Sequence, residues 1–426
     1  MSVGIRETAG AIGTEAARWS AWRAGWRARL WPLESGRGAI PALDGLRALA
    51  ALSVLVYHAS SVAGAKTIIG GHDLTWLYFY TESGVDLFFT LSGFLLFLPY
   101  ARAFMDGKSG PRALVFYRRR ALRILPAYYA CLFVVALAET LSGSGPSAGN
   151  IGAHLVLLHD IWPAFNRTIS GPFWTLAVEW QFYLILPWVA WLIGRFSAGS
   201  ARRLALGPLA LIAVAVGIRE AAAQIEAHWT ALPAAWLPAV DWALRVAIGS
   251  QGKYLEVFGV GMLCAVAYLV AVERGGLALS RARWVGLALL ALALAVYLAF
   301  APLVYTRRNE ILAQWYRALH PADATMMLGP LALGICYGAL LLGALLGPGL
   351  ARAALSWAPL RFVGLISYSL YLWHESVINV VYPRLPHTAI PSPLNGVVAL
   401  AVGFGVAIPL AYLSYQLIER PFLKMR

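Results

Sequence analysis

The sequence predicts an all-α membrane protein that crosses the bilayer about ten times and has no separate soluble domain. Hydrophobic residues make up 60% of the 426 residues and charged residues only 13%, whereas soluble domains average roughly 45–50% and 25%. Ten apolar runs have about the 20-residue length that an α-helix needs to span a membrane. The stretches between these runs are too short to fold as independent domains.

The ten predicted spans lie in a single transmembrane domain over residues 39–426. Residues 1–38 come before it as a basic cytoplasmic tail, in which Trp19, Trp22 and Trp26 recur on one face of an amphipathic helix suited to the headgroup region; a disordered basic leader is the alternative. Prolines within the apolar runs are expected to bend or break helices. The spans cover residues 45–63, 80–101, 123–142, 173–194, 204–223, 254–273, 284–303, 324–346, 361–382 and 395–417.

The distribution of basic residues predicts the orientation. With both termini in the cytoplasm, 24 of the 34 Lys and Arg residues face inward, as the positive-inside rule requires for a multi-pass protein of the plasma membrane. The net charge of +14 therefore follows from topology, and no nucleic-acid partner is predicted. The three cysteines lie within apolar runs and lack metal-ligand spacing, so no metal site is predicted.

The first span carries Arg47 and His58, with no other ionisable residue between them. Eleven residues at 100° each return to the same helix face, about 16 Å further along the axis. Ionisable groups aligned inside a membrane are costly in lipid and usually face a protein-lined cavity. An interfacial arginine and an unrelated structural histidine are the alternative interpretation.

The second and third spans contribute candidate donor-binding residues. Ser92 is followed by Gly93, a small-residue pair that also suits close helix packing. Arg120 and Arg123 stand three positions apart at the start of the third span, so they project from one side. Paired guanidinium groups bind phosphate bidentately, although the positive-inside rule alone would place arginines here.

The fourth and ninth spans carry the remaining candidates. Glu179 is a carboxylate predicted in the outer half of the membrane, where it could orient a histidine, bind a hydroxyl group or pair with an arginine. In the ninth span Ser367, Tyr371 and His374 share one face. His374 lies at the same depth as His58, so the two rings could meet in one cavity; two unrelated histidines are the alternative.

Six motifs in this order resemble acyltransferase family 3, the integral-membrane acyltransferases. The resemblance implies ten core helices, a cytoplasmic acyl-CoA donor, and an acyl acceptor hydroxyl on a glycan, lipid-linked sugar or glycosylated metabolite. It places Arg47, His58, Arg120 and Arg123 among the functional residues. The motifs are Arg47-x10-His58, FFxxSG at 88–93, RxxR at 120–123, WTLAVEWQFY at 174–183, SYSLYLWH at 367–374 and ERPF at 419–422.

This chain departs from the family pattern in two respects. Some members carry an additional esterase-like domain, which this sequence is expected to lack. Many members have a proline soon after the histidine of the ninth span, where this chain has Glu375. The second departure leaves the role of His374 open.

We therefore predict an acyl-CoA-dependent O-acyltransferase that moves an acyl group, with acetyl favoured, and needs no permanently bound cofactor. The alternative is a proton-coupled transporter or flippase of a sugar-containing substrate, which would also use inward-facing ionisable residues. The two halves of the chain show no repeat, which counts against a carrier. The predicted catalytic residues are His58, Glu179, Tyr371 and His374, and the predicted donor-binding residues are Arg47, Ser92, Arg120 and Arg123.

Overall fold

The computed structural model describes residues 40–64, 68–69, 72–73, 75–249, 252–273, 275, 277–305, 324–386 and 394–425. Helices account for nearly all the elements in this part of the chain. One small antiparallel pairing joins β1 (Ile68–Ile69) to β2 (His72–Asp73). The predicted amphipathic helix of the tail, residues 1–38, lies outside the described residues.

The described helices follow one another along the chain. The first half comprises α2 (Pro41–Val62), α3 (Trp76–Phe79), η1 (Tyr80–Ser83), α4 (Gly84–Met105), α5 (Ala113–Leu141), α6 (Ala148–Leu155), η2 (His159–Ile161), α7 (Phe173–Ser197), α8 (Ala201–Ala227), η3 (Trp229–Ala231), η4 (Ala234–Trp236) and α9 (Leu237–Ile248). The second half comprises α10 (Leu255–Tyr268), η5 (Leu269–Glu273), α11 (Leu279–Tyr305), α13 (Ala324–Leu346), α14 (Gly349–Leu355), α15 (Ala358–Leu365), α16 (Ser367–Val381), η7 (Tyr382–Arg384), α17 (Leu394–Val402), η9 (Gly403–Ala407), α18 (Ile408–Ser414), η10 (Tyr415–Glu419) and α19 (Arg420–Leu423).

Nine stretches of helix within the described residues are long and apolar enough to cross a membrane. They correspond to nine of the ten predicted spans, in the predicted order. The predicted fold class, an all-α polytopic membrane protein, is confirmed, and the described residues form no separate soluble domain. Such a bundle satisfies every backbone hydrogen bond within its own segments, as a hydrocarbon environment demands.

The predicted span over 361–382 is divided into two helices, α15 and α16. Ile366, between them, has φ −91° and ψ 6°, outside the helical region. Gly364 packs directly against the backbone of Asp44, where any side chain would clash. The close approach of α15 to the start of α2 thus holds the break in place.

The last span also departs from a regular α-helix. It contains two π-helical segments, η9 and η10, on either side of α18. Pro409 stands in the first turn of α18, directly after η9, so the irregularity occurs where the missing N–H of proline would interrupt the hydrogen bonds. π-helical turns of this kind are frequent at functional sites.

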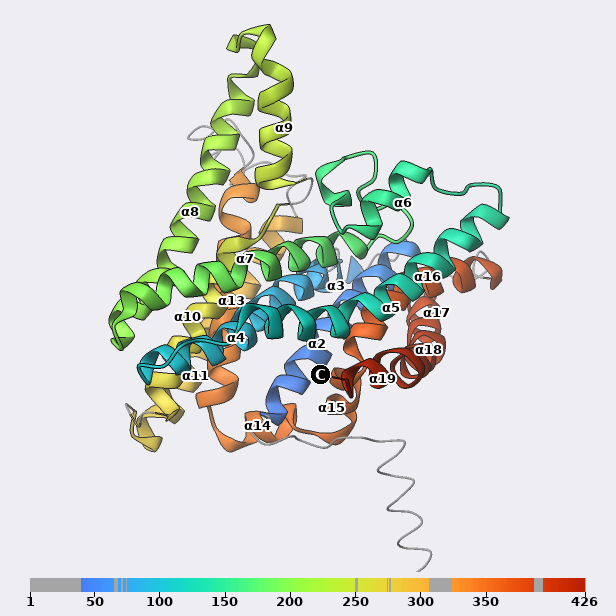
Figure 1. Cartoon of the computed structure of the whole chain (residues 1–426). Helices are drawn as coiled ribbons and strands as arrows, with labels where there is room; N and C mark the ends of the chain where they lie inside the picture. Colours follow the sequence, from blue (N-terminus) through green and yellow to red (C-terminus); the bar gives the residue numbers. More distant parts are fainter. Residues whose placement is uncertain are drawn as a thin grey trace, which may run out of the picture.

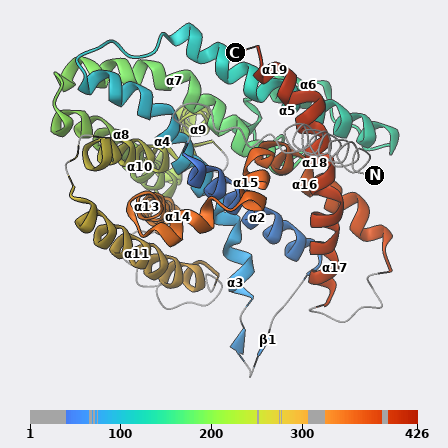
Figure 2. The same ribbon diagram turned by 90° about the horizontal axis from the view of Figure 1, so that it is seen from below.

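Helix α2 runs through the middle of the molecule, drawn blue in Figure 2, and packs against α4, α15, α16 and α17. Beside it, α4 and α10 approach closely because Gly93 faces the backbone of Phe258 and Gly261 faces that of Thr90. Figure 1 shows α8 and α9 rising together above the rest of the bundle. The central position of α2 places the side chains of its inward face in the protein interior.

Candidate active site

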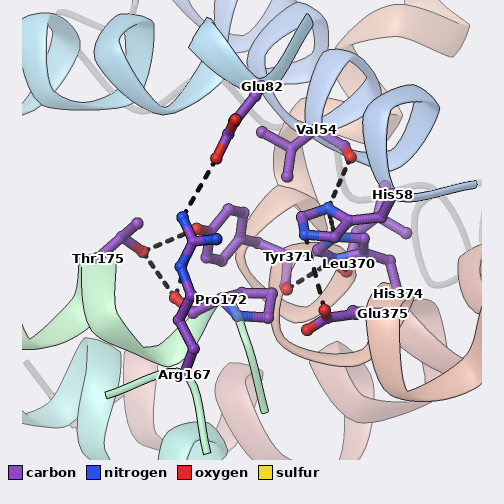
Figure 3. Close-up of polar contacts among 10 residues, drawn as sticks. All are labelled: Val54, His58, Glu82, Arg167, Pro172, Thr175, Leu370, Tyr371, His374 and Glu375. Atoms are coloured by element: carbon purple, nitrogen blue, oxygen red, sulfur yellow. Dashed lines mark hydrogen bonds and ion pairs between the residues drawn. The ribbon is translucent and has the colours of Figure 1, made fainter. Parts of the chain in front are cut away.

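His58 and His374 form a direct contact between α2 and α16. His374 Nε2 lies 3.1 Å from His58 Nδ1, and the two ring centroids are 4.9 Å apart at an interplanar angle of 66° (Figure 3). His374 is 1% exposed, whereas the His58 side chain is 19% exposed. The structure therefore brings the two predicted histidines together, with His374 behind His58.

The backbone around the pair determines where the ring hydrogens lie. His374 Nδ1 is 2.8 Å from the carbonyl oxygen of Tyr371 and 3.1 Å from that of Leu370. Carbonyl oxygens only accept hydrogen bonds, so Nδ1 donates and Nε2 of the neutral ring accepts. His58 Nδ1 must then donate, to His374 and to the carbonyl of Val54 at 2.9 Å.

This arrangement leaves Nε2 of a neutral His58 without a hydrogen. Nε2 faces a small cavity, which we call the histidine cavity. A free imidazole lone pair beside a cavity is the arrangement that a general base requires. The cavity has a volume of about 110 Å³ and includes in its lining His58, Glu82, Arg167, Trp174, Tyr371 and Glu375.

A second and larger cavity, which we call the arginine cavity, contains Arg47 of α2 together with Arg120 and Arg123 of α5. Its volume is about 290 Å³. Three guanidinium groups in one cavity favour a ligand with several negative charges. All four predicted donor-binding residues lie here: Arg47, Ser92, Arg120 and Arg123.

Glu179 also lines the arginine cavity. Its Oε1 accepts hydrogen bonds from the hydroxyls of Ser92 and Tyr183, each at 2.5 Å. Of the three roles left open by the sequence, this position does not favour orienting a histidine, because the described contacts of the His58 nitrogens are with His374, Val54 and Glu375. The carboxylate instead partly offsets the positive charge of the arginines.

Tyr371 separates the two cavities and lines both of them, as does Val85. The Thr175 hydroxyl donates to the carbonyl of Pro172 at 2.8 Å. The Tyr371 hydroxyl, 2.8 Å from Thr175 Oγ1, is therefore positioned to donate to Thr175. Tyr371 is thus held between the arginines and His58, and the described bonds of its hydroxyl are with Thr175 and Pro172 and not with either histidine nitrogen.

Three charged residues of the histidine cavity were not singled out from the sequence. Glu375 Oε1 lies 3.8 Å from His58 Nε2, and Arg167 forms an ion pair with Glu82 at 3.3 Å. The position of Glu375, a carboxylate directly after His374, could have indicated its role, but in the sequence it stands out only as a departure from the family pattern. Arg167 and Glu82 gave no local signal, because they come from a loop and a short helical turn.

The loop that delivers Arg167 has an unusual backbone. Arg167 and Ile169 both have positive φ, 58° and 62°, which is costly for residues other than glycine. Between them, the Thr168 hydroxyl contacts the Phe165 carbonyl at 2.6 Å and Asn150 Oδ1 at 3.0 Å. These contacts hold the strained loop over the cavity, where the Arg167 guanidinium lies 5.8 Å from the ring of Trp174.

The same loop region contains a stacked histidine pair, His154 and His159. The rings are 3.8 Å apart and 4° from parallel, and both residues are 0% exposed. Burial, and secondarily the neighbouring His154, lowers the pKa of His159 to about 3, and burial lowers the pKa of His154. The folded loop therefore holds both rings neutral. In an opened loop the two histidines would titrate near pH 6.5.

We expect the loop to lose stability as the pH falls below about 6.5, because the opened state then binds more protons than the folded state. Between pH 7 and pH 5 the loss from His159 is about 2 kcal/mol, at 1.36 kcal/mol per pH unit. Hydrogen exchange of residues 154–170, corrected for intrinsic rates, would measure this loss of stability.

Two variants test its origin. His159→Phe should reduce the pH dependence of the exchange, whereas His228→Phe, at an exposed histidine, should leave it intact. Equal protection at both pH values would contradict this expectation.

Within the described residues, no group of three or more His, Cys, Asp or Glu side chains is arranged to hold a metal ion. What the site offers is a basic imidazole with fixed hydrogen positions, a positively charged cavity on one side of Tyr371, and a mixed-charge cavity on the other. This arrangement suits a reaction between an anionic substrate and a hydroxyl group.

Comparison with known proteins matches most of the chain to one family model. The family model Acyl_transf_3, described as an acyltransferase domain, matches residues 40–416. A peptidoglycan O-acetyltransferase of Listeria monocytogenes is 26% identical over 403 residues, covering 90% of this chain and 56% of that protein. A Bacillus subtilis protein provisionally named a peptidoglycan O-acetyltransferase is 28% identical over 411 residues, covering 90% and 54%. The chain thus spans about half the length of these curated relatives. No solved structure matches it significantly.

Proposed function

This chain belongs to acyltransferase family 3, and from that membership we propose that it moves an acyl group, with acetyl favoured, from cytoplasmic acyl-CoA to a hydroxyl of a glycan, lipid-linked sugar or glycosylated metabolite. The family supports a membrane-embedded acyltransferase as such; the donor and the acyl acceptor are our proposal. The name of the Listeria relative makes peptidoglycan the first glycan to test.

The observation that carries this proposal is the pair of cavities that adjoin at Tyr371. The arginine cavity holds three guanidinium groups against the single carboxylate of Glu179, which suits the phosphates of CoA. The histidine cavity holds His58, which suits the acyl acceptor hydroxyl. Arg47 and His58 are separated by about 16 Å of helix rise, a distance of the same order as an extended pantetheine arm. The donor phosphates and the thioester would thus occupy successive positions along α2.

The orientation follows from the charge distribution. With the termini and the arginine cavity toward the cytoplasm, 24 of the 34 basic residues face inward, as expected for a plasma-membrane protein. CoA would then enter from the cytoplasm, and the histidine cavity would lie toward the outer side. This geometry would let a cytoplasmic donor serve an acyl acceptor at the outer surface.

His58 is the proposed general base. Its Nε2 takes the proton of the acyl acceptor hydroxyl as the oxygen attacks the thioester carbonyl carbon. The C–S bond then breaks, and the departing sulfur takes the proton back from the imidazolium, so that an ester and free CoA are formed. His374 acts through His58, because its fixed Nδ1–H keeps the proton of His58 on Nδ1.

The test is whether the purified protein releases CoA. We expect free thiol to appear when the protein is given acetyl-CoA, and labelled acetyl to enter an isolated cell-envelope fraction in equal amount. A transporter would leave the thioester intact. If neither the thiol nor labelled envelope forms, the acyl-CoA donor is excluded.

A further inference from the structure

The side chains that line the two cavities carry opposite net charge. The arginine cavity contains three guanidinium groups and one carboxylate, whereas the histidine cavity contains the carboxylates of Glu82 and Glu375 against the single guanidinium of Arg167. An anionic group is therefore favoured in the first cavity and disfavoured in the second. With about 110 Å³, the histidine cavity is also smaller than the roughly 300–1,000 Å³ of complete ligand sites. It therefore has room for only part of a larger molecule, and an anionic part is disfavoured.

Glu375 and His58 are spaced for a shared ligand. The distance from Glu375 Oε1 to His58 Nε2 is 3.8 Å, longer than the roughly 2.7–3.2 Å of a direct hydrogen bond. Hydroxyl oxygens in the cavity could approach both atoms. The carboxylate is held in place by Gly171, where an added Cβ would lie 2.5 and 2.6 Å from its two oxygens. A Cβ at position 171 would displace the carboxylate, which is the movable end of the Glu375 side chain.

His58 Nε2 and the Glu375 carboxylate both accept hydrogen bonds. His58 Nε2 carries no hydrogen in the neutral ring. The ring hydrogen lies on Nδ1, which donates to His374 Nε2 and to the Val54 carbonyl. An ionised carboxylate also only accepts. A single hydroxyl has one hydrogen, which the reaction requires at Nε2. The Glu375 carboxylate already accepts from the backbone N–H of Gly171, but with about four acceptor sites it can also bind a second hydroxyl of the same molecule.

We propose that the histidine cavity is the acyl acceptor subsite and that Glu375 binds a second hydroxyl beside the reacting one, so that the enzyme selects uncharged diols and polyols over simple alcohols. This inference rests on the proposed function and goes further by naming the chemical class of the acyl acceptor. A hydrogen bond to a charged group contributes about 1.5–3 kcal/mol, which corresponds to about a tenfold to hundredfold preference.

The test uses the purified full chain with acetyl-CoA and two small probes, 1,2-propanediol and 1-propanol, that differ by one hydroxyl. We expect the wild-type protein to acetylate the diol at least tenfold more efficiently in kcat/KM. Glu375→Ala should reduce this preference to within about twofold, and Glu375→Gln, which keeps one oxygen acceptor, should lie between. Acetyl-CoA hydrolysis without any alcohol should fall less than diol transfer in both Glu375 variants, because water needs no second hydroxyl; it reports any effect of the substitution on His58 itself.

Glu139→Ala is the matched control, since it removes a carboxylate from α5 outside both cavities and should keep the wild-type preference. The inference is overturned if the wild-type protein shows no diol preference or acetylates neither probe, or if Glu375→Ala retains the preference. It is also overturned if hydrolysis falls in both Glu375 variants as much as transfer does, because Glu375 would then act on His58 itself. A wild-type protein that consumes no acetyl-CoA would instead overturn the proposed function, and this inference with it.

Discussion

Replacing His58 with alanine should lower acyl transfer by about 10²–10⁴-fold, the contribution of a well-placed general base. The physical reason is that an alcohol is a poor nucleophile until its proton is removed, and His58 Nε2 is the unprotonated nitrogen that faces the histidine cavity. Expression and membrane insertion should be unchanged. The measurement is product formation from labelled acetyl-CoA by purified variants.

Two further variants sharpen this experiment. His374→Ala should cause a smaller loss, because the Val54 carbonyl still holds the ring hydrogen of His58 on Nδ1, and only the second partner of that hydrogen is lost. His228→Ala removes an exposed histidine and should have no effect. Near-normal turnover by His58→Ala would refute the base mechanism, while leaving the family membership intact.

Replacing Arg120 or Arg123 with alanine should raise the KM for acyl-CoA by about tenfold to hundredfold. Each guanidinium can form charge-assisted bonds with a CoA phosphate, contributing about 1.5–3 kcal/mol, and tenfold corresponds to about 1.4 kcal/mol. The KM for the acyl acceptor should change much less, since neither arginine lines the histidine cavity. Initial rates at varied donor and acyl acceptor concentrations would separate the two constants.

The neighbouring Arg119 provides a matched control, because it is exposed on the same helix and lies outside the arginine cavity. Arg119→Ala should leave both constants unchanged, although it removes the same charge. Lysine at position 120 or 123 should restore donor binding only in part, because it lacks the planar fork of arginine. An unchanged donor KM in a folded double alanine variant would assign this pair to membrane topology alone.

Much of the fold could be predicted because membrane helices are specified locally. A run of about 20 apolar residues is sufficient to predict a spanning helix, and nine such helices are present in the described residues. The break at Ile366 could not be predicted in this way. It depends on the close packing of Gly364 against Asp44, more than 300 positions away in the chain.

The candidate site was predictable in its residue types and in the meeting of His58 with His374, but not in its other contacts. All eight candidate residues lie in the two cavities or directly behind His58. Which cavity each carboxylate lines was not predictable. Glu179 lies with the arginines, and the carboxylate beside His58 belongs to Glu375.

The sequence by itself determined that this is a helical membrane protein and that Arg47 and His58 share one face of its first helix, because composition and helical period are properties of neighbouring residues. Only the tertiary structure decided which helix face meets which. The contact between His58 and His374 joins residues 316 positions apart, and together with the Val54 carbonyl it leaves Nε2 of His58 free to act. Such contacts depend on packing between separate helices, of which the local pattern gave only the matching depth of the two histidines.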